Sequence, residues 1–426
     1  MNKKISFITY GCKLNQSETE KMAEKLSENN YEINFEEKNG ESDIYILNTC
    51  TVTSEAERKI RQTIRRIKRK NPKVKIIATG CYSHTDANKI KEIGADLVLG
   101  NLEKKYIDET INEEGIIVDK AYWLRKEDKI EIPDNPLGER TRVFLPIEEG
   151  CHNACSYCRI IFARGTKIRS LEKNIILDKI SDFIKKGIKE IVLTGINLGY
   201  YGYGTDYNFK YLLQDIAIKF NNEDIRIRIS SLYPDMIDEE FSKIINKSNI
   251  FEKHVHLSLQ HVSNNVLKMM GRKYIKKDII NAFNNLRKFD KDFSITADII
   301  VGFPGETEED FNELLEFIEK NRLLKVHGFR FSARPNTKAK RLKPQIPGNI
   351  KKDRNKKLSE TSKTSSKEYL NNMLNKRVKV LIEEDNKGYD EYYINHIIEN
   401  KNFEENIFKE VKIKKIIAEG VVSDVF

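Results

Sequence analysis

The six cysteines of the chain fall into two groups of three. The first group, Cys151, Cys155 and Cys158, occupies one short segment with the spacing C-x3-C-x2-C. Three thiolates in such a loop can bind one [4Fe-4S] cluster, although the usual full set is four cysteines. One iron would then keep an open coordination position, which marks a reactive metal site. A structural zinc ion with His152 as fourth ligand is the alternative, but adjacent residues of a tight loop rarely converge on one tetrahedral ion.

The second group, Cys12, Cys50 and Cys81, is spread over the N-terminal part of the chain. Each of these cysteines closely follows an apolar run that we interpret as a strand. In an open parallel sheet the carboxyl ends of the strands lie at one edge, where ligands bind. We therefore expect this group to bind a second [4Fe-4S] cluster, again with one iron left open. Three unrelated small residues at strand ends are the alternative.

The elements around the second group alternate between strands and helices. This alternation is typical of an α/β fold with a parallel sheet and crossover helices. We assign residues 1–125 to this N-terminal domain and interpret the polar residues 101–140 as a connection that leads out of it. The strands are expected at 5–10, 43–48, 74–79 and 96–99, and the helices at 17–27, 54–70 and 85–93.

A second alternation contains the first cysteine group. We interpret residues 137–368 as a partial (β/α)6 barrel, because six β/α units close only part of an eight-stranded barrel. The cysteine loop follows the first strand, and functional groups of such barrels lie on loops after the strands' carboxyl ends. The strands are expected at 143–147, 190–195, 225–230, 254–259, 295–301 and 327–331, and the helices include 171–186, 235–246, 276–288 and 308–319.

The C-terminal part of the chain returns to short strands. Residues 338–375 are basic and polar, and we interpret them as a surface helix and linker. Short apolar runs predict a small β-barrel over residues 372–426, a fold that commonly binds oligonucleotides. The runs are 378–383, 392–398 and 411–417.

The composition favours a folded protein that meets a polyanion. The chain has 426 residues, of which 39% are hydrophobic and 33% charged, and its net charge is +10. These values exclude collagen-like, disulfide-stapled and wholly disordered chains. No apolar stretch approaches the ~18 residues that a membrane span needs, and the first apolar run is too short for a signal peptide. We therefore expect a cytoplasmic protein with no membrane partner, whose cysteines are ligands rather than disulfides.

Two regions are candidate RNA contacts. The predicted helix at 54–70 is crowded with cations, which favours a polyanionic partner, although a solvated face is the alternative. Tyr392, with Tyr389 and Tyr393, is a candidate for stacking on bases, and a place in the barrel core is the alternative. The basic candidates are Arg58, Arg61, Arg65, Lys68 and Arg69.

The chain resembles the radical S-adenosylmethionine (SAM) methylthiotransferases along nearly its whole length. The C-x3-C-x2-C motif marks the radical SAM superfamily, and the N-terminal cysteine group with a β-rich tail similar to a TRAM domain narrows it to this family. The branch that acts on N6-threonylcarbamoyladenosine (t6A) in tRNA is indicated by segments 11–16, 193–199 and 301–307 and by Gly388-Tyr389. The sequence departs from the family pattern at Ile161, Tyr233, His261, Val262 and Asn336.

The resemblance implies a reaction and two cofactors. SAM would bind the open iron of the first cluster and yield a 5′-deoxyadenosyl radical, which takes hydrogen from carbon 2 of t6A at position 37, beside the anticodon. The second cluster would hold the sulfur that is methylated by another SAM and delivered. The implied partners are tRNA, SAM and an electron donor such as flavodoxin or ferredoxin. The alternatives are a methylthiotransferase for isopentenyladenosine or a ribosomal protein aspartate, and a non-catalytic iron–sulfur RNA-binding protein.

Four residues are expected to contact SAM. Thr194 and Gly195 end a predicted strand, where the backbone could approach the ligand closely, and Gly302 could do the same. Turn geometry is the alternative reason for these glycines. Arg164 follows the cysteine loop and is expected to face the carboxylate of SAM or the substrate.

Overall fold

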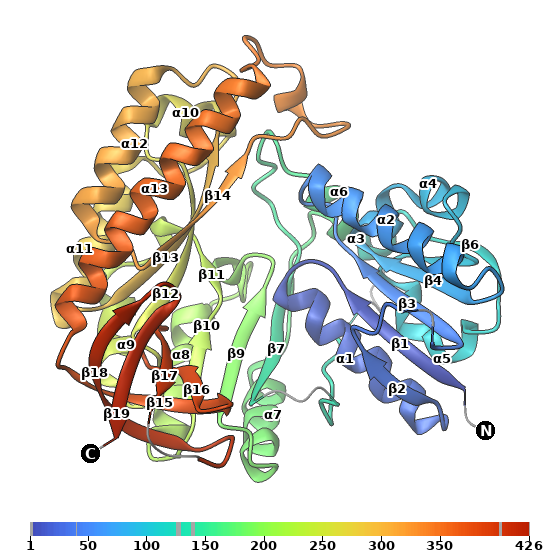
Figure 1. Ribbon diagram of the computed structural model, residues 1–426, viewed down its shortest axis with the longest axis horizontal. Coiled ribbons are helices and arrows are strands. Elements are labelled where there is room, and N and C mark those ends of the chain that lie inside the picture. The colour runs from blue at the N-terminus through green and yellow to red at the C-terminus, as the bar shows by residue number, and fades with distance from the viewer. Residues whose placement is uncertain (1–2, 40, 125–128, 138–140, 400–402, 426) are drawn as a thin grey trace.

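The computed structural model describes residues 3–39, 41–124, 129–137, 141–399 and 403–425. An N-terminal α/β unit lies beside a central barrel of strands and helices, and a small β-barrel packs against the central unit at the C-terminal end of the chain (Figure 1). The predicted fold class is confirmed. The predicted domain limit at residue 125 lies outside the described residues.

The N-terminal unit is a parallel sheet of six strands in the order β2-β1-β3-β4-β5-β6. Its central strand β3 is buried along its whole length, and two apolar clusters lie against the sheet. The strands are β1 (Lys4–Thr9), β2 (Glu32–Phe35), β3 (Ile44–Thr49), β4 (Lys75–Gly80), β5 (Leu97–Leu99) and β6 (Gly115–Ile117). The helices are α1 (Lys13–Glu28), α2 (Ser54–Lys70), α3 (Cys81–Thr85), α4 (Ala87–Glu92), α5 (Ile107–Thr110) and the 3-10 turns η1 (Glu103–Tyr106) and η2 (Tyr122–Leu124).

Two edge strands of this sheet were not predicted. The strand β2 is half-exposed, and β6 has only three residues, so neither gives an apolar pattern long enough to recognise. The interpretation of residues 101–140 as an irregular connection is therefore wrong for the segment that forms η1, α5 and β6. The predicted helices 17–27 and 85–93 are corrected at their starts, since α1 begins at Lys13 and α3 at Cys81.

The strands of the central unit form two sheets, β10-β9-β7-β8 and β11-β12-β13-β14, in which all neighbouring strands are parallel except β7 and β8. One bridge between Ile227 and Phe251 joins the two sheets, so the predicted partial barrel is confirmed. The strands are β7 (Arg142–Glu149), β8 (Arg169–Ser170), β9 (Glu190–Gly195), β10 (Arg226–Ile229), β11 (Ser231–Leu232), β12 (His254–Gln260), β13 (Ser294–Val301) and β14 (Lys325–Arg330).

Helices follow the barrel strands and bury the main apolar core between helix and strand. They are α6 (Ile160–Arg164), α7 (Lys173–Lys185), α8 (Phe209–Phe220), α9 (Glu239–Lys247), α10 (Asn264–Met270), α11 (Lys276–Phe289) and α12 (Glu308–Asn321), with 3-10 turns η3 (Leu198–Tyr200), η4 (Pro234–Met236) and η5 (Lys338–Lys340). The last helix, α13 (Gly348–Met373), packs on β14 and α12. The helix predicted for residues 338–375 is present, but its buried residues Leu358 and Met373 pack on neighbouring elements, so this segment is not a linker.

The C-terminal unit is a closed barrel in the order β15-β16-β17-β19-β18, as predicted. It docks against the amino-terminal ends of the central strands, where Arg226 Nη1 donates to Tyr389 O at 2.8 Å. The strands are β15 (Arg377–Glu384), β16 (Lys387–Tyr389), β17 (Asn395–Ile398), β18 (Phe408–Ile417) and β19 (Gly420–Val425). Among the described residues, no helix is long and apolar enough to cross a membrane.

Candidate active site

The first cysteine group lies on the loop between β7 and α6, at the carboxyl end of a barrel strand. Gly150 opens this loop with a φ of +102°, and an added Cβ there would lie 2.1 Å from the carbonyl oxygen of Lys167. Only glycine fits where the chain leaves the strand. Ser156 N donates to Met270 O at 2.9 Å, which ties the loop to α10.

Burial favours the protonated form of the Cys151 and Cys158 thiols in the absence of metal. It raises the pKa of Cys151 to about 11 and that of Cys158 to about 12, and the charge of Cys155 adds to both increases. The three sulfur atoms therefore lie within electrostatic reach of one another. Metal ligation requires thiolates, so a bound iron would replace the protons. A set of three convergent thiols fits an iron–sulfur cluster.

A cage of tyrosines around Arg272 lies beside the cysteine loop. The guanidinium carbon is 4.7 Å from the ring centre of Tyr233, 5.6 Å from that of Tyr274 and 5.8 Å from that of Tyr157. Its Nη2 donates to the Tyr157 hydroxyl at 2.6 Å. Tyr233, which departs from the family pattern, makes a cation–π contact with this guanidinium. No motif in the sequence singles out Arg272.

The second cysteine group gathers at the carboxyl edge of the N-terminal sheet, after β1, β3 and β4. Cys50 and Cys81 are buried, and Cys12 is exposed. Burial raises the pKa of Cys50 to about 12, and the charges of Cys81 and Cys12 add to this increase. An added Cβ on Gly11, beside Cys12, would lie 3.1 Å from Cys50 Cβ, and Arg164 donates both to Cys81 and to Asn15, the hydrogen-bond partner of Cys12. The three cysteines therefore share one site, whose donor set also fits an iron–sulfur cluster.

The turn before Cys81 explains how β4 delivers its cysteine to this edge. Gly80 has a φ of +89°, and an added Cβ would lie 2.3 Å from Asn48 Oδ1 and 2.6 Å from Thr49 N. The chain turns here against the neighbouring strand β3 and starts α3 at the cysteine itself. The glycine therefore sets the distance between two of the strand ends that carry the second group.

Neither group is arranged for a single metal ion. Among the described residues, no three His, Cys, Asp or Glu side chains lie close enough together to hold one ion. A cubane cluster is wider than one ion, because each of its three thiolates binds a different iron atom. The alternative of a zinc ion with His152 as fourth ligand gains no support from this arrangement.

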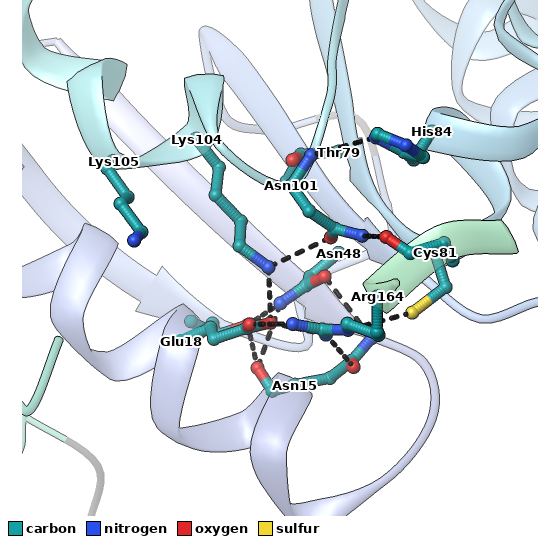
Figure 2. A network of polar contacts seen from close by, with 12 residues as sticks. Asn15, Glu18, Asn48, Thr79, Cys81, His84, Asn101, Lys104, Lys105 and Arg164 are labelled. Atoms are coloured by element: carbon teal, nitrogen blue, oxygen red, sulfur yellow. Dashed lines mark hydrogen bonds and ion pairs between the residues drawn. The ribbon is translucent and has the colours of Figure 1, made fainter. Parts of the chain in front are cut away.

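Arg164 connects the two cysteine groups (Figure 2). It belongs to α6, which follows the first cysteine loop, yet its guanidinium lies within the N-terminal unit. Its Nε donates to Cys81 Sγ at 3.3 Å, and its Nη2 donates to Asn15 Oδ1 at 3.0 Å. Its Nη1 donates to Glu149 Oε1 at 2.8 Å, and the guanidinium also pairs with Glu18. Arg164 was expected to face the carboxylate of SAM or the substrate; in the structure its donors are directed to Cys81, Asn15, Glu18 and Glu149.

Two further arginines fix the N-terminal unit against the central unit. Arg159 Nη1 lies 3.2 Å from Glu57 Oε1, and its Nη2 lies 2.8 Å from Asp86 Oδ2. Arg334 Nη2 donates to the same oxygen, Glu57 Oε1. Asn336, next to this arginine, has a φ of 63°, which asparagine tolerates where the family pattern has glycine. The two cysteine groups therefore flank one interface lined by buried ion pairs.

Comparisons with known proteins identify the family to which the chain belongs. Residues 4–100 match the Uncharacterized protein family UPF0004, and residues 145–318 match the Radical SAM superfamily. The Threonylcarbamoyladenosine tRNA methylthiotransferase MtaB of Thermotoga maritima is 39% identical over 99% of this chain and 96% of its own. The chain belongs to the MtaB-like branch of the radical SAM methylthiotransferase family. MtaB of Bacillus subtilis is 36% identical over 96% of this chain and 93% of its own.

Other relatives of this methylthiotransferase differ in their substrates. The tRNA-2-methylthio-N(6)-dimethylallyladenosine synthase of Clostridium tetani is 33% identical over 91% of this chain and 87% of its own. Among solved structures, the radical SAM methyltransferase TsrM of Kitasatospora setae has a TM-score of 0.55 and 13% identity, covering 77% of this chain and 73% of its own. The likeness to TsrM concerns the fold alone.

The methylthiotransferase has a buried carboxylate next to two of the predicted SAM contacts, Thr194 and Gly195. An added Cβ on Gly195 would lie 2.8 Å from Glu148 Oε2, which accepts a hydrogen bond of 2.7 Å from Asn197 N. Glu148 Oε1 has no hydrogen-bond partner among the described residues. Burial raises the pKa of Glu148 well above its usual range. At the other predicted glycine, Gly302, the space of a Cβ is taken by Lys351, with Cγ 2.4 Å away.

The basic helix α2 divides its cations between ion pairs and an open hollow. Two of the candidate RNA contacts have partners within the chain: Lys68 Nζ lies 2.7 Å from Asp96 Oδ2, and Arg61 Nη1 donates to the Tyr82 hydroxyl at 3.0 Å. Arg58 pairs with Glu55 at the surface. The other two candidates, Arg65 and Arg69, line a hollow of about 610 Å³ together with Tyr10, Lys38, Lys59, Gln62, Thr63 and Arg66.

The tyrosines of the C-terminal barrel lie at its contact with the central unit. The Tyr392 hydroxyl donates to Asp290 Oδ2 at 3.0 Å. The Tyr393 ring stacks on His254 with centroids 4.6 Å apart and lies 4.3 Å from the Arg228 guanidinium carbon. Through these contacts the rings of Tyr392 and Tyr393, which were candidates for stacking on bases, pack between the C-terminal barrel and the central unit. Their hydrogen-bonding and cation–π partners lie in the central barrel.

Proposed function

We propose that the protein transfers a methylthio group to carbon 2 of t6A at position 37 of tRNA, beside the anticodon. One observation carries the proposal: two groups of three cysteines flank a single interface in a chain that matches MtaB proteins over nearly its full length. A non-catalytic RNA-binding protein would have no need for two thiol sites held against each other. We assign residues 1–125 to sulfur delivery, 137–368 to radical formation and 372–426 to a TRAM-like barrel.

The cysteines would hold two [4Fe-4S] clusters, one on Cys151, Cys155 and Cys158 and one on Cys12, Cys50 and Cys81. When bound, the first supplies the electron that cleaves SAM, and the second supplies a metal-bound carrier for the transferred sulfur. The protein's own task is to bring both sites to the open carboxyl end of the barrel. The ion pairs of Arg159 and Arg334 with Glu57 serve this task, because they join the two units beside the cysteines.

SAM would lie between the first cysteine group and the end of β9. The buried oxygen Glu148 Oε1 has no protein partner among the described residues and is suited to accept a hydrogen bond from an ammonium group. Gly195 allows this carboxylate to approach the strand end closely. We therefore add Glu148 to Thr194, Gly195 and Gly302 as a candidate SAM contact.

The hollow beside α2 is suited to bind the phosphate backbone of tRNA. Arg65 and Arg69 line it together with further cations, whereas Lys68 is already paired with Asp96. Phosphate contacts fix the position of an RNA without reading its sequence. A protein that modifies tRNA with reduced iron–sulfur clusters would act in the cytoplasm and receive electrons from a carrier such as flavodoxin or ferredoxin.

Mass spectrometry of tRNA nucleosides tests the substrate. Cells that lack the gene should lose 2-methylthio-t6A and accumulate t6A, and the gene should restore the product. The matched control is the gene with Cys151→Ala, which should not restore it. Loss of the methylthio derivative of dimethylallyladenosine instead would assign the protein to the activity named for its Clostridium tetani relative. An unchanged nucleoside profile would exclude both substrates.

A further inference from the structure

Arg164 is a fully buried cation whose contacts reach beyond its own unit. Its side chain is 1% exposed. It lies in α6, which starts two residues after Cys158, whereas its sulfur partner Cys81 belongs to the N-terminal sheet. Burial of a guanidinium is costly unless charged or strongly accepting groups surround it. The surrounding groups therefore indicate what this charge is for.

The charged groups around Arg164 do not cancel. Glu18 and Glu149 are the acidic partners. Burial alone would raise the pKa of both carboxyl groups, but the nearby cations outweigh it: Arg164 and Lys104 lower the pKa of Glu18, and Arg169 and Arg164 lower that of Glu149 below its usual range. Lys104 Nζ lies 2.5 Å from Glu18 Oε2, and Arg169 Nη2 lies 2.7 Å from Glu149 Oε2. Three cations thus face two carboxylates, which leaves one positive charge in excess beside the second cysteine group.

A [4Fe-4S] cluster in its usual oxidised state carries a core charge of 2+, so three thiolate ligands leave it with one negative charge. The excess positive charge around Arg164 matches this value. The match is also directional, because Nε of Arg164 points at the sulfur of Cys81 (Figure 2). Hydrogen bonds to cluster sulfurs and the local net charge are the main protein features that set a cluster's reduction potential.

We propose that Arg164 is a positioning residue for the second cluster. Its guanidinium donates to the Cys81 ligand, balances the charge of the three thiolates and raises the cluster's reduction potential. Because the same residue follows the loop of Cys151, Cys155 and Cys158, it also keeps the second group in place relative to the first. The inference rests on the proposed function only in that Cys12, Cys50 and Cys81 bind a cluster.

The test isolates the second cluster within the full chain. A background with Cys151, Cys155 and Cys158 all replaced by Ala leaves only the second site for iron. In this background, Arg164→Gln should lower the midpoint potential measured by redox titration with electron paramagnetic resonance. We expect the ratio of reduced to oxidised cluster at the parent's midpoint to fall about tenfold, which is about 59 mV for one electron. Arg164→Lys keeps the charge and should recover most of the potential.

Two further variants separate this role from a loss of stability. Glu18→Gln combined with Arg164→Gln removes one carboxylate with the guanidinium, so it should fold and bind iron better than Arg164→Gln. It keeps the excess positive charge but lacks the hydrogen bond to Cys81, so its potential should lie between those of Arg164→Gln and the parent. Arg334→Gln removes a buried interface ion pair that does not touch a cysteine, and its potential should equal the parent's. If Arg164→Gln binds no iron at all, the double variant supplies the potential.

The experiment distinguishes a failure of the second cluster from a failure of the role of Arg164. Iron-free protein in the background variant itself would refute the second cluster and, with it, both the inference and the sulfur-carrier assignment. A normal cluster whose potential is the same with Arg164, Gln or Lys at this position would overturn the inference alone. An equal shift with Arg334→Gln would also overturn it, because the effect would then come from the interface in general.

Discussion

At the scale of single residues, the second cysteine group depends on a glycine. Gly80→Ala should destabilise the N-terminal unit and reduce iron binding at Cys12, Cys50 and Cys81, because an added Cβ would lie 2.3 Å from Asn48 Oδ1 and 2.6 Å from Thr49 N. A methyl group that meets backbone has little room to move, so we expect a cost of about 2–4 kcal/mol in the free energy of unfolding. Thermal unfolding and iron analysis measure the two effects.

Gly115→Ala is the matched control for this prediction. Gly115 has a φ of +103° in the same sheet, but an added Cβ there would meet nothing within 4 Å. It therefore reports the backbone strain without the collision, which we put at about 1 kcal/mol. Equal losses of stability and iron in the two variants would show that the contact with β3 does not position Cys81.

Residue types and spacing indicated the six cysteines as candidate cluster ligands, but they did not indicate which side chains surround them. The loop of Cys151, Cys155 and Cys158 could be recognised because its ligands are local in sequence. Arg164 and Cys81 are 83 positions apart, and no periodic pattern connects them. The sequence also did not indicate Glu148 or Arg272 as site residues, since a single charged residue looks the same in a sequence whether it lies on the surface or in a buried site. Only the tertiary contacts distinguish the two cases.

At the scale of elements, α2 shows why the number of cations on a helix does not by itself identify a binding site. The helix pattern predicted its bounds correctly, from Ser54 to Lys70. It did not reveal which cations are already paired, because Asp96 reaches Lys68 from another part of the chain. Short edge strands such as β6 were missed for a related reason: three residues carry too little periodicity.

The paired and unpaired cations of α2 give a prediction about tRNA affinity. Changing Arg65 and Arg69 together to Gln should weaken tRNA binding and reduce the slope of log K against log salt by about 1.4–1.8, because each lost phosphate contact contributes about 0.7–0.9. Arg58→Gln, on the same helix but outside the hollow, should change the slope by much less. Filter binding or fluorescence anisotropy over a salt series measures the slope. Equal slopes for the double variant and the parent would move the RNA interface away from this hollow.

At the scale of the whole molecule, the N-terminal and C-terminal units meet the central barrel at opposite ends. The N-terminal unit approaches the carboxyl end of the barrel strands through Arg159, Arg164 and Arg334, whereas the C-terminal barrel docks at the amino-terminal ends of β7 and β10. The order of units could be predicted from the alternation of strands and helices. Their docking could not, because it depends on side chains such as Tyr393 that pattern analysis assigns equally well to a core or a surface.

This arrangement predicts that the two cysteine groups can be separated by mutation. Cys50→Ala should still produce 5′-deoxyadenosine from SAM in the presence of a reductant, yet form no methylthio product. The reason is structural: Cys50 ends β3 in the N-terminal sheet, and the loop of the first group is anchored to α10 by hydrogen bonds from Ser156. Cys151→Ala should abolish both products, because it removes a thiol from the site that would bind SAM. Both products are measured in the same reaction mixture by liquid chromatography and mass spectrometry.

Misfolding is the competing explanation for a loss of product in Cys50→Ala. The contacts that join the N-terminal unit to the central unit should remain in this variant. Arg164 contacts Cys81 rather than Cys50, and Arg159 contacts Glu57 and Asp86, so the ion pairs that hold the two units together survive the substitution. Circular dichroism and an iron content of about one cluster per chain would establish that the variant is folded. A folded Cys50→Ala protein that transfers methylthio groups at the parent's rate would show that the N-terminal group does not carry the sulfur. The N-terminal sheet would then need a different role, such as tRNA binding through the hollow beside α2.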